Sequence, residues 1–160
     1  TLKHSFGMTS IVELSKLLND LILEKYGSEK EIDILGFSMG GIIGRYWIKK
    51  FEGYKRTRRF ITVGSPHQGT FTSQLVPKYP FKGISEMKIN SSLLRDLSKY
   101  NFLLKDIECI SFFSYWDLMV FPGWLANLNT GKKISLQVYK HRNLVRNNIA
   151  VEKIIEQIMK

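Results

Sequence analysis

The chain has 160 residues, of which 44% are hydrophobic and 24% are charged, a composition typical of one folded domain with a single core. Its apolar stretches are short and broken by charge, which excludes a membrane-spanning helix of roughly 18 to 20 apolar residues. The net charge of +10 is compatible with a nucleic-acid partner, but a charged run is more often a solvated face, and we expect no nucleic-acid partner.

The first predicted element is a helix that begins at Ser10. Ser10-Ile-Val-Glu13 has the capping-box pattern, in which the serine accepts a backbone hydrogen bond and the glutamate three residues later returns one. Apolar residues continue at helical spacing after it, and Gly27 is the expected stop after Tyr26.

Strands and helices alternate along the rest of the chain. We predict strands at 31–35, 60–63, 107–113 and 134–139, and helices at 40–51, at 91–97 and from Asn147 or Asn148 onwards. This alternation predicts an α/β fold, a mostly parallel sheet flanked by helices, in a single domain spanning 1–160. Within it, the polar and irregular segment 68–101 is a candidate lid or pocket insertion.

Two further features limit the chemistry. Six of the eleven residues in 49–59 are basic, but this run leads into the amino end of a predicted strand, whereas parallel sheets bind ligands at the carboxyl ends. Cys109, the only cysteine, lies in the apolar run 107–113, which predicts a buried thiol and excludes an internal disulfide or a thiolate metal cluster. We expect neither metal nor cofactor. Because the first residues lack signal-peptide features, we expect a cytoplasmic location.

The segment between the strand at 31–35 and the helix at 40–51 contains Gly36-Phe-Ser38-Met-Gly40. A Gly-x-Ser-x-Gly pattern between a strand and a helix is typical of a nucleophile elbow, in which the serine has a strained backbone. We expect Gly36 and Gly40 both to require the absence of a side chain. Ser38 is the candidate nucleophile, and the backbone amide of Met39, at the start of the helix, is the candidate oxyanion donor.

The candidate base is selected from three histidines. His4 precedes the nucleophile, whereas the usual chain order in this fold is serine, acid, histidine. His67 follows a strand and is expected to shape the wall of the substrate pocket. His141 follows the last predicted strand and precedes the last helix, so it is the predicted base, and a solvated histidine between Lys140 and Arg142 is the alternative.

The candidate acid is Asp117, a few residues beyond the strand that ends at Phe113. A carboxylate at this edge of the sheet can orient the imidazole of the base and stabilise its cationic form. Asp106 enters the same strand at its other end and faces the wrong edge. Asp96 is the weaker alternative for the acid and is expected to be a charge on a helix surface.

Four segments resemble the bacterial lipase and esterase branch of the α/β hydrolases, which is related to triacylglycerol lipases and inositol deacylase-like proteins. They are the glycine-rich turn at 36–41, the Gly-Ser-Pro-His-Gln-Gly loop within 62–70, the acid segment 114–120 and the base segment 141–144. The resemblance implies a serine hydrolase that cleaves carboxylic, lipid-like esters through an acyl-enzyme intermediate. It also implies that the family's first strands, and a loop with the second oxyanion donor, belong before Thr1.

We expect the substrate-binding residues to be Phe37, His67, Leu118 and Met119, and the partners to be an ester or lipid substrate and, transiently, a membrane or lipid surface. An acyltransferase or a thioesterase would use the same triad and is the first alternative. The second alternative is a catalytically silent hydrolase-like module that binds a partner. The sequence does not indicate the oligomeric state.

Overall fold

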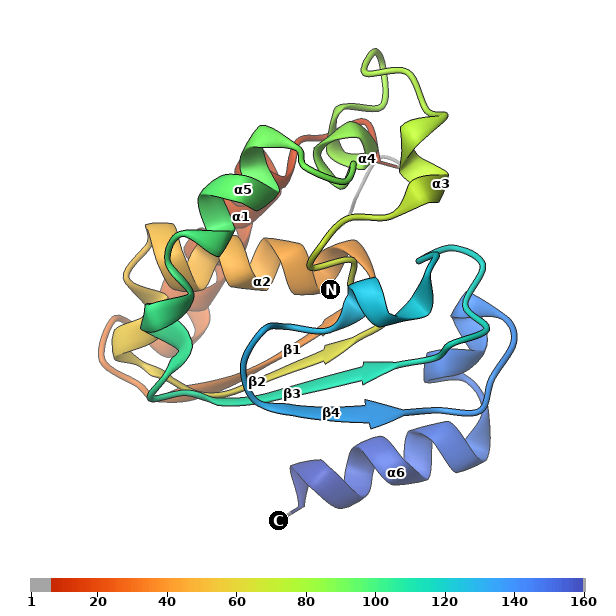
Figure 1. Cartoon of the computed structure of the whole chain (residues 1–160). Helices are drawn as coiled ribbons and strands as arrows, with labels where there is room; N and C mark the ends of the chain where they lie inside the picture. The colour runs from red at the N-terminus through yellow and green to blue at the C-terminus, as the bar shows by residue number, and fades with distance from the viewer. Residues whose placement is uncertain (1–6, 160) are drawn as a thin grey trace.

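The computed structural model describes residues 7–159 and contains a parallel four-stranded sheet with helices on both faces (Figure 1). The strands are β1 (Ile32–Phe37), β2 (Thr57–Val63), β3 (Glu108–Phe113) and β4 (Lys132–Ser135). The α-helices are α1 (Ile11–Tyr26), α2 (Met39–Lys50), α3 (Phe71–Gln74), α4 (Lys82–Glu86), α5 (Ser92–Ser98) and α6 (Asn148–Ile158). Short 3-10 helices cover Gly53–Lys55, Asn101–Leu104, Gly123–Ala126 and His141–Val145. The predicted parallel α/β sheet is confirmed.

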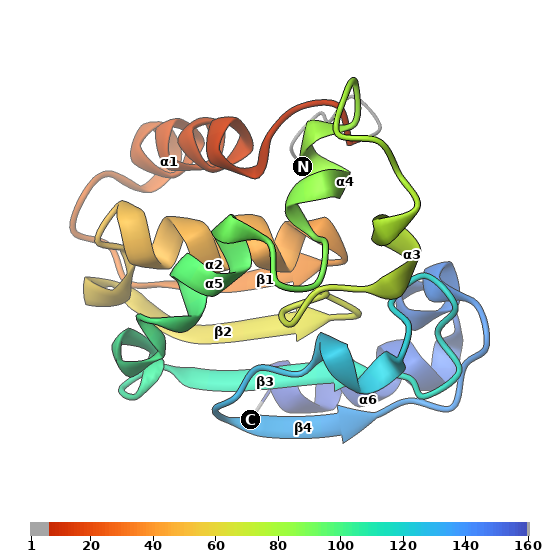
Figure 2. The same ribbon diagram turned by 45° about the horizontal axis from the view of Figure 1, so that its top comes forward.

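The order of the strands determines where a site can form. They lie side by side in the order β1-β2-β3-β4, and each neighbouring pair is parallel. All four carboxyl ends therefore meet at one edge of the sheet (Figure 2). The chain leaves each strand into a loop at this edge, which brings together segments that are far apart in the sequence.

The core has one layer on each face of the sheet. Helices α1, α2 and α5 cover one face and α6 covers the other (Figure 1). Trp47 and Ile48 of α2 pack with Phe60 of β2 on the first side. On the second side, Ile154 of α6 belongs to the same buried cluster as Phe112 of β3. The nucleophile turn and the loops around it are thus built on a strand and a helix that are both firmly packed.

The predicted helices begin where their caps indicate. Ser10 Oγ accepts a hydrogen bond from the Glu13 amide at 3.2 Å, and the Glu13 carboxylate accepts one from the Ser10 amide at 3.3 Å, so the capping box is confirmed. Ser91 caps α5 and Asn147 caps α6 through their side chains. A capping side chain accepts a hydrogen bond from an amide only two or three residues later, so a short stretch of sequence is enough to indicate the cap.

All four predicted strands differ from the structure at their ends. β1 runs to Phe37, two residues past the predicted end, and β2 starts at Thr57, three residues before the predicted start. β3 starts one residue later than predicted, at Glu108, and β4 two residues earlier, at Lys132. The predicted strand at 134–139 is wrong beyond Ser135, because its partner β3 ends at Phe113. The Phe113 carbonyl accepts the Leu136 amide at 2.7 Å and the Ser114 hydroxyl donates to the Val138 carbonyl at 2.6 Å, so the following apolar residues are buried in a loop.

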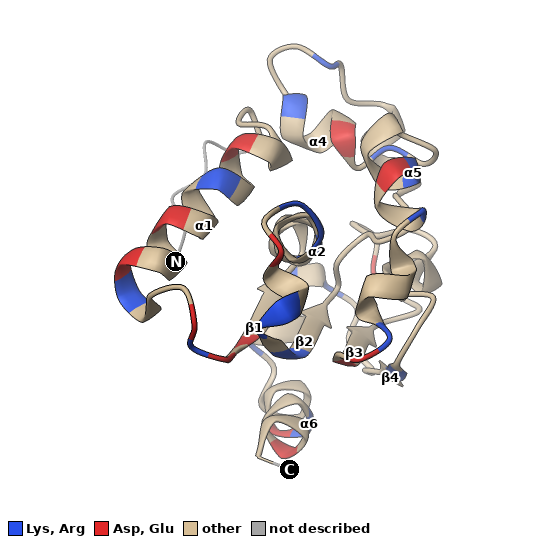
Figure 3. Ribbon diagram, turned by 90° about the vertical axis from the view of Figure 1, so that its left-hand side faces the viewer, with Lys and Arg blue, Asp and Glu red and all other residues tan. Residues whose placement is uncertain are grey.

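The basic run ends at the amino edge of the sheet, on the side that faces the viewer in Figure 3. Arg58 and Arg59 of β2 both bind the Asp33 carboxylate, and Arg59 also donates to the Ile158 carbonyl in the last turn of α6 at 2.6 Å. Hydrogen bonds from Arg58, and then from Arg59, lower the pKa of Asp33 to about 2. None of the helices formed by residues 7–159 is both long and apolar enough to cross a membrane.

Candidate active site

Ser38 occupies the turn between β1 and α2. Its backbone has φ 53° and ψ −126°, a conformation that is strained for a residue with a side chain. The Ser38 amide donates to the Val63 carbonyl at 2.9 Å, which ties the turn to the end of β2. The strained elbow predicted from Gly-x-Ser-x-Gly is therefore present.

The glycines around Ser38 differ in how much space they have. A Cβ at Gly36 would collide with the backbone of Gly41, as predicted for this position. Gly40 has open space around it, so the prediction that it too must lack a side chain is wrong. The steric requirement falls on Gly41 instead, where a Cβ would collide with Ser65 Oγ. Gly41 is buried against the loop after β2, which the local motif cannot reveal.

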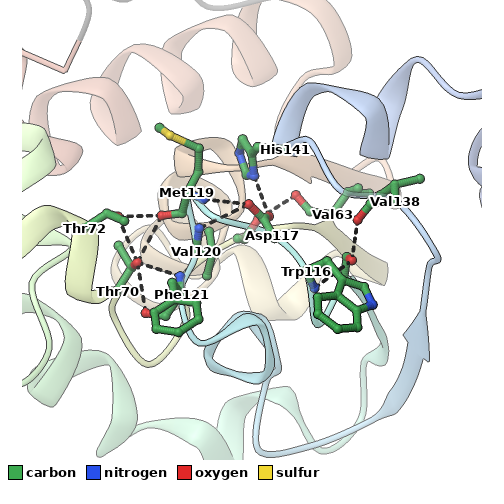
Figure 4. Close-up of polar contacts among 12 residues, drawn as sticks. Val63, Thr70, Thr72, Trp116, Asp117, Met119, Val120, Phe121, Val138 and His141 are labelled. Atoms are coloured by element: carbon green, nitrogen blue, oxygen red, sulfur yellow. Dashed lines mark hydrogen bonds and ion pairs between the residues drawn. The ribbon is translucent and has the colours of Figure 1, made fainter.

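Asp117 and His141 meet at the carboxyl edge of the sheet. Asp117 Oδ2 lies 2.6 Å from His141 Nδ1, and both side chains are buried (Figure 4). Asp117 Oδ1 accepts hydrogen bonds from the amides of Met119 at 2.9 Å and Val120 at 3.3 Å. With Nδ1 engaged by the carboxylate, Nε2 remains to face a reacting group. No hydrogen bond to this buried Nε2 is present among the described residues.

His141 lies directly beside the nucleophile turn. Its ring stacks on the ring of Phe37, the residue before Ser38, with centroids 4.8 Å apart. It also lies next to Gly64, where a Cβ would come within 3.0 Å of the imidazole. In the part of the chain that the structure describes, Ser38 and His141 are not hydrogen bonded to each other. Such contacts are often long without a substrate and shorten when one binds.

The start of α2 contributes the electrostatic part of the site. Met39 is the first residue of this 12-residue helix, where backbone amides have no partner within the helix. The helix dipole favours negative charge at the same position. The Met39 amide is therefore suited to stabilise an oxyanion formed next to Ser38.

The structure encloses His67 in the core. Its ring lies edge-on to Phe60 at 6.1 Å between centroids, and in the described structure neither ring nitrogen has a hydrogen-bond partner. Burial, and then the nearby Arg45 guanidinium, hold the pKa of His67 well below 6.5, so the imidazole is neutral. The pocket-wall role assigned to His67 from the sequence remains a prediction.

The sequence did not indicate Arg45. This side chain of α2 is buried and donates to the His67 carbonyl at 3.0 Å and to Asn101 Oδ1 at 2.8 Å. Burial lowers the pKa of Arg45 to about 10, so the group stays cationic at neutral pH. The sequence could have indicated this buried residue, because Arg45 is spaced three residues from both Ile42 and Ile48 on the apolar face of the helix. A charge on that face needs buried partners.

Exposed apolar side chains lie on the loops at this edge. Leu118 and Met119, next to Asp117, are 72% and 60% exposed, and the Trp116 ring lies 6.0 Å from that of Tyr139. The other large exposed apolar residues of these loops are Phe71, Leu75, Tyr79, Tyr115, Phe121 and Trp124. Apolar surface of this extent next to a reactive group is typical of a site for an apolar ligand.

The remaining candidates from the sequence lie elsewhere. His4 is outside the described residues. Asp96 forms a salt bridge with Lys49 at 2.5 Å on the helix surface, as expected, and Asp106 is exposed before β3. Cys109 is buried, as predicted, and burial raises the pKa of its thiol to about 12. Residues 7–159 contain no group of three or more His, Cys, Asp or Glu side chains that could hold a metal ion.

Solved structures with the same fold include several hydrolases. The mature lipase BlEst2 of Bacillus licheniformis is 12% identical, with a TM-score of 0.69 over 94% of this chain and 74% of that one. MGS-MChE2, an α/β hydrolase from the sediment metagenome of the Mar Chica lagoon in Morocco, is 15% identical, with a TM-score of 0.65 over 97% of this chain and 72% of that one. Phospholipase PlaB of Legionella pneumophila, 12% identical, has a TM-score of 0.59 over 71% of this chain and 28% of that one.

The sequence itself places the chain in a family. A comparison with curated proteins gave no match. The family model described as palmitoyl protein thioesterase matches residues 3–118, which include the nucleophile turn and end one residue beyond Asp117. The hydrolase fold, the nucleophile elbow at Ser38 and this family match all indicate a hydrolase. The chain therefore belongs to the palmitoyl protein thioesterase family and is an ester hydrolase with the fold of these α/β hydrolases.

Proposed function

We propose that Ser38, His141 and Asp117 form a catalytic triad that hydrolyses the ester of an apolar acyl chain through an acyl-enzyme intermediate. The observation that carries this proposal is the 2.6 Å contact between Asp117 and His141 beside a serine held in the elbow conformation. A buried carboxylate fixes the tautomer and orientation of the imidazole, leaving Nε2 as the proton acceptor.

The reaction proceeds in two halves. His141 Nε2 takes the proton of Ser38 Oγ while Oγ attacks the ester carbonyl carbon, and the Met39 amide stabilises the oxyanion of the tetrahedral intermediate. The intermediate collapses as His141 returns the proton to the leaving alcohol, and the acyl group stays on Ser38. Water, activated by His141 in the same way, then releases the carboxylic acid and restores the serine.

The acyl group is proposed to be a lipid chain. The loops around the site carry exposed apolar side chains, and we assign Leu118 and Met119 among them, together with the half-buried Phe37 at the end of β1, to the acyl-binding surface. His67 supports the same wall from within the core. Two proteins of the same fold are a lipase and a phospholipase, and a lipid ester fits the apolar surface here. Transient contact with a lipid surface follows from the same exposed residues.

A second candidate substrate is an acyl thioester, favoured by the match to a thioesterase family. The triad chemistry is unchanged, and only the leaving atom differs, sulfur instead of oxygen. Oxyester and thioester substrates with the same acyl chain, compared by kcat/KM, separate the two. A preference of tenfold or more for the thioester would replace the oxyester as the proposed substrate.

Substitution of the nucleophile tests the proposal. We expect Ser38→Ala to abolish hydrolysis of a short p-nitrophenyl ester and labelling by a fluorophosphonate, with an unchanged unfolding temperature, because only the nucleophilic oxygen is removed. Ser98→Ala, which removes a hydroxyl from an exposed position on α5, is the matched control and should behave as the unchanged protein. Turnover by Ser38→Ala near the unchanged rate would reject Ser38. A chain that neither labels nor hydrolyses would be the silent binding module.

A further inference from the structure

The carboxylate of Asp117 is held from two sides. Its Oδ2 contacts His141, whereas its Oδ1 accepts the amides of Met119 and Val120. The direction of the carboxylate therefore depends on the backbone of the segment 117–121. Any shift of that segment changes the angle at which Asp117 meets the imidazole.

The segment 117–121 is held in turn by two threonines at the start of α3. Thr72 Oγ1 donates to the Met119 carbonyl at 2.6 Å, and Thr70 Oγ1 lies 3.0 Å from the same oxygen. Thr70 Oγ1 also accepts the Phe121 amide at 2.9 Å, and the two threonine hydroxyls lie 3.0 Å apart. Figure 4 shows this network running from His141 through Asp117 and Met119 to Thr70 and Thr72.

Side-chain packing alone does not fix this segment. The side chains of Leu118, Met119 and Phe121 are exposed. Val120 is the buried residue among the four in 118–121. Hydrogen bonds from residues 70–72 therefore help to fix the loop, namely those to the Met119 carbonyl and the one from the Phe71 amide to the Phe121 carbonyl at 3.0 Å. Thr72 is the second residue of α3 and is only partly buried. Apart from the Met119 carbonyl, its hydroxyl contacts the hydroxyl of Thr70.

We propose that Thr72, supported by Thr70, is a positioning residue that sets the orientation of Asp117 toward His141. The inference rests on the proposed triad, in which Asp117 orients the base. It links α3 to the proposed triad, since Thr72 donates to the Met119 carbonyl and the Met119 amide donates to Asp117. Thr72 touches neither substrate nor reacting atoms and acts only through the acid.

Thr72→Val removes the hydroxyl and keeps the shape of the side chain, whereas Thr72→Ser keeps the hydroxyl. We expect Thr72→Val to lower kcat by about tenfold with KM within about twofold, and Thr72→Ser to restore kcat to within about threefold of the unchanged protein. The second readout is the downfield NMR resonance of the His141 Nδ1 proton, which a hydrogen bond to a carboxylate produces. It should be weakened or shifted upfield in Thr72→Val and kept in Thr72→Ser.

The NMR readout separates this inference from the proposed function, because it is recorded in the Ser38→Ala background and needs no turnover. Equal kcat and an unchanged resonance in Thr72→Val would overturn the positioning role even if Ser38 proves essential. So would a loss of thermal stability without a change in the resonance, or a Thr72→Ser variant as impaired as Thr72→Val. Thr72→Ala, which cannot crowd the Met119 carbonyl, is the second variant and should match Thr72→Val. Absence of the resonance from Ser38→Ala with Thr72 intact also overturns the inference.

Discussion

The imidazoles of His141 and His67 are both buried, yet only His141 has an acidic partner. A carboxylate at Nδ1 prepares His141 to receive a proton at Nε2. His67 has a guanidinium as its charged neighbour and an apolar ring beside it, so protonation there is disfavoured. The same side chain thus lies in two chemically different environments.

This contrast predicts opposite outcomes for two substitutions. His141→Ala should lower kcat by roughly three orders of magnitude or more, because Ser38 loses its proton acceptor and the leaving group its donor. His67→Leu keeps the volume of the buried side chain approximately and should change kcat by no more than about tenfold. Steady-state kinetics on a soluble ester, with circular dichroism to verify folding, decides between them. A dead His67→Leu beside an active His141→Ala would show that the base is assigned to the wrong histidine.

His67 also predicts how stability depends on pH. The unfolded chain takes up a proton at this imidazole as the pH falls through about 6.5, whereas the folded protein does so only at a much lower pH. The unfolded state then binds more protons, so the free energy of unfolding decreases as the pH is lowered, by at most about 1.4 kcal/mol per pH unit from this group. Urea unfolding between pH 7.5 and 4.5 should show a smaller decrease for His67→Leu. Parallel curves for the two proteins would contradict this assignment.

At the scale of elements, the elbow depends on how closely α2 approaches the loop after β2. Gly41 sits against Ser65, whose hydroxyl donates to the Gly36 carbonyl at 3.3 Å on the other side of the turn. Ser65, in the loop after β2, therefore contacts both β1 and α2 on either side of the Ser38 turn. The backbone strain at Ser38 is supported by these contacts rather than by the serine itself.

Two adjacent glycines provide a matched test of that packing. Gly41→Ala should lower the free energy of unfolding by about 1–3 kcal/mol and reduce kcat, because the new Cβ displaces Ser65 and the loop it belongs to. Gly40→Ala places the same methyl group in open space, one residue earlier in the same helix, and should leave stability equal or up to about 1 kcal/mol higher. Thermal and urea unfolding measure both. Equal losses in the two variants would contradict the steric assignment.

Local signals in the sequence predict the elements far better than the contacts between them. The caps at Ser10, Ser91 and Asn147 are complete within four residues, and so the helix starts follow from the sequence. The end of β4 depends on where β3 stops, which no pattern within 134–139 contains. Chain order indicated Asp117 and His141, which the structure brings into contact, although their catalytic roles remain a proposal. Arg45, Thr70 and Thr72 form tertiary hydrogen bonds whose partners no local pattern contains, although the place of Arg45 on the apolar face of α2 indicates that it needs buried partners.

At the scale of the whole molecule, the arginines of β2 and the exposed apolar loops lie at opposite edges of the sheet. Arg58 and Arg59 of the basic run bind Asp33 at the amino edge of the sheet, and Arg59 also binds the end of α6. Exposed apolar side chains instead lie on the loops at the carboxyl edge, beside the candidate triad. The edge proposed to meet a lipid is therefore the edge that carries the chemistry.

This arrangement predicts a difference between soluble and aggregated substrates. Leu75 and Tyr79, each 90% exposed on the segment after α3, offer apolar area that a lipid surface can cover. The double variant Leu75→Ser/Tyr79→Ser should bind phosphatidylcholine–phosphatidylglycerol vesicles about tenfold more weakly while hydrolysing a short soluble ester normally. Leu17→Ser/Leu21→Ser, on α1, is the control and should bind as the unchanged protein. Equal vesicle binding by all three proteins would reject a lipid-facing role for this segment.

The strand order β1-β2-β3-β4 repeats the order of synthesis on the ribosome. The elbow with Ser38 emerges first, the loop carrying Thr70 and Thr72 follows β2, and Asp117 follows β3. His141 comes only after β4, 103 residues after Ser38. If these residues form the triad, a nascent chain carries its nucleophile without a base while those residues are made. Reactivity toward acyl groups would then begin only once the segment with His141 has folded into place.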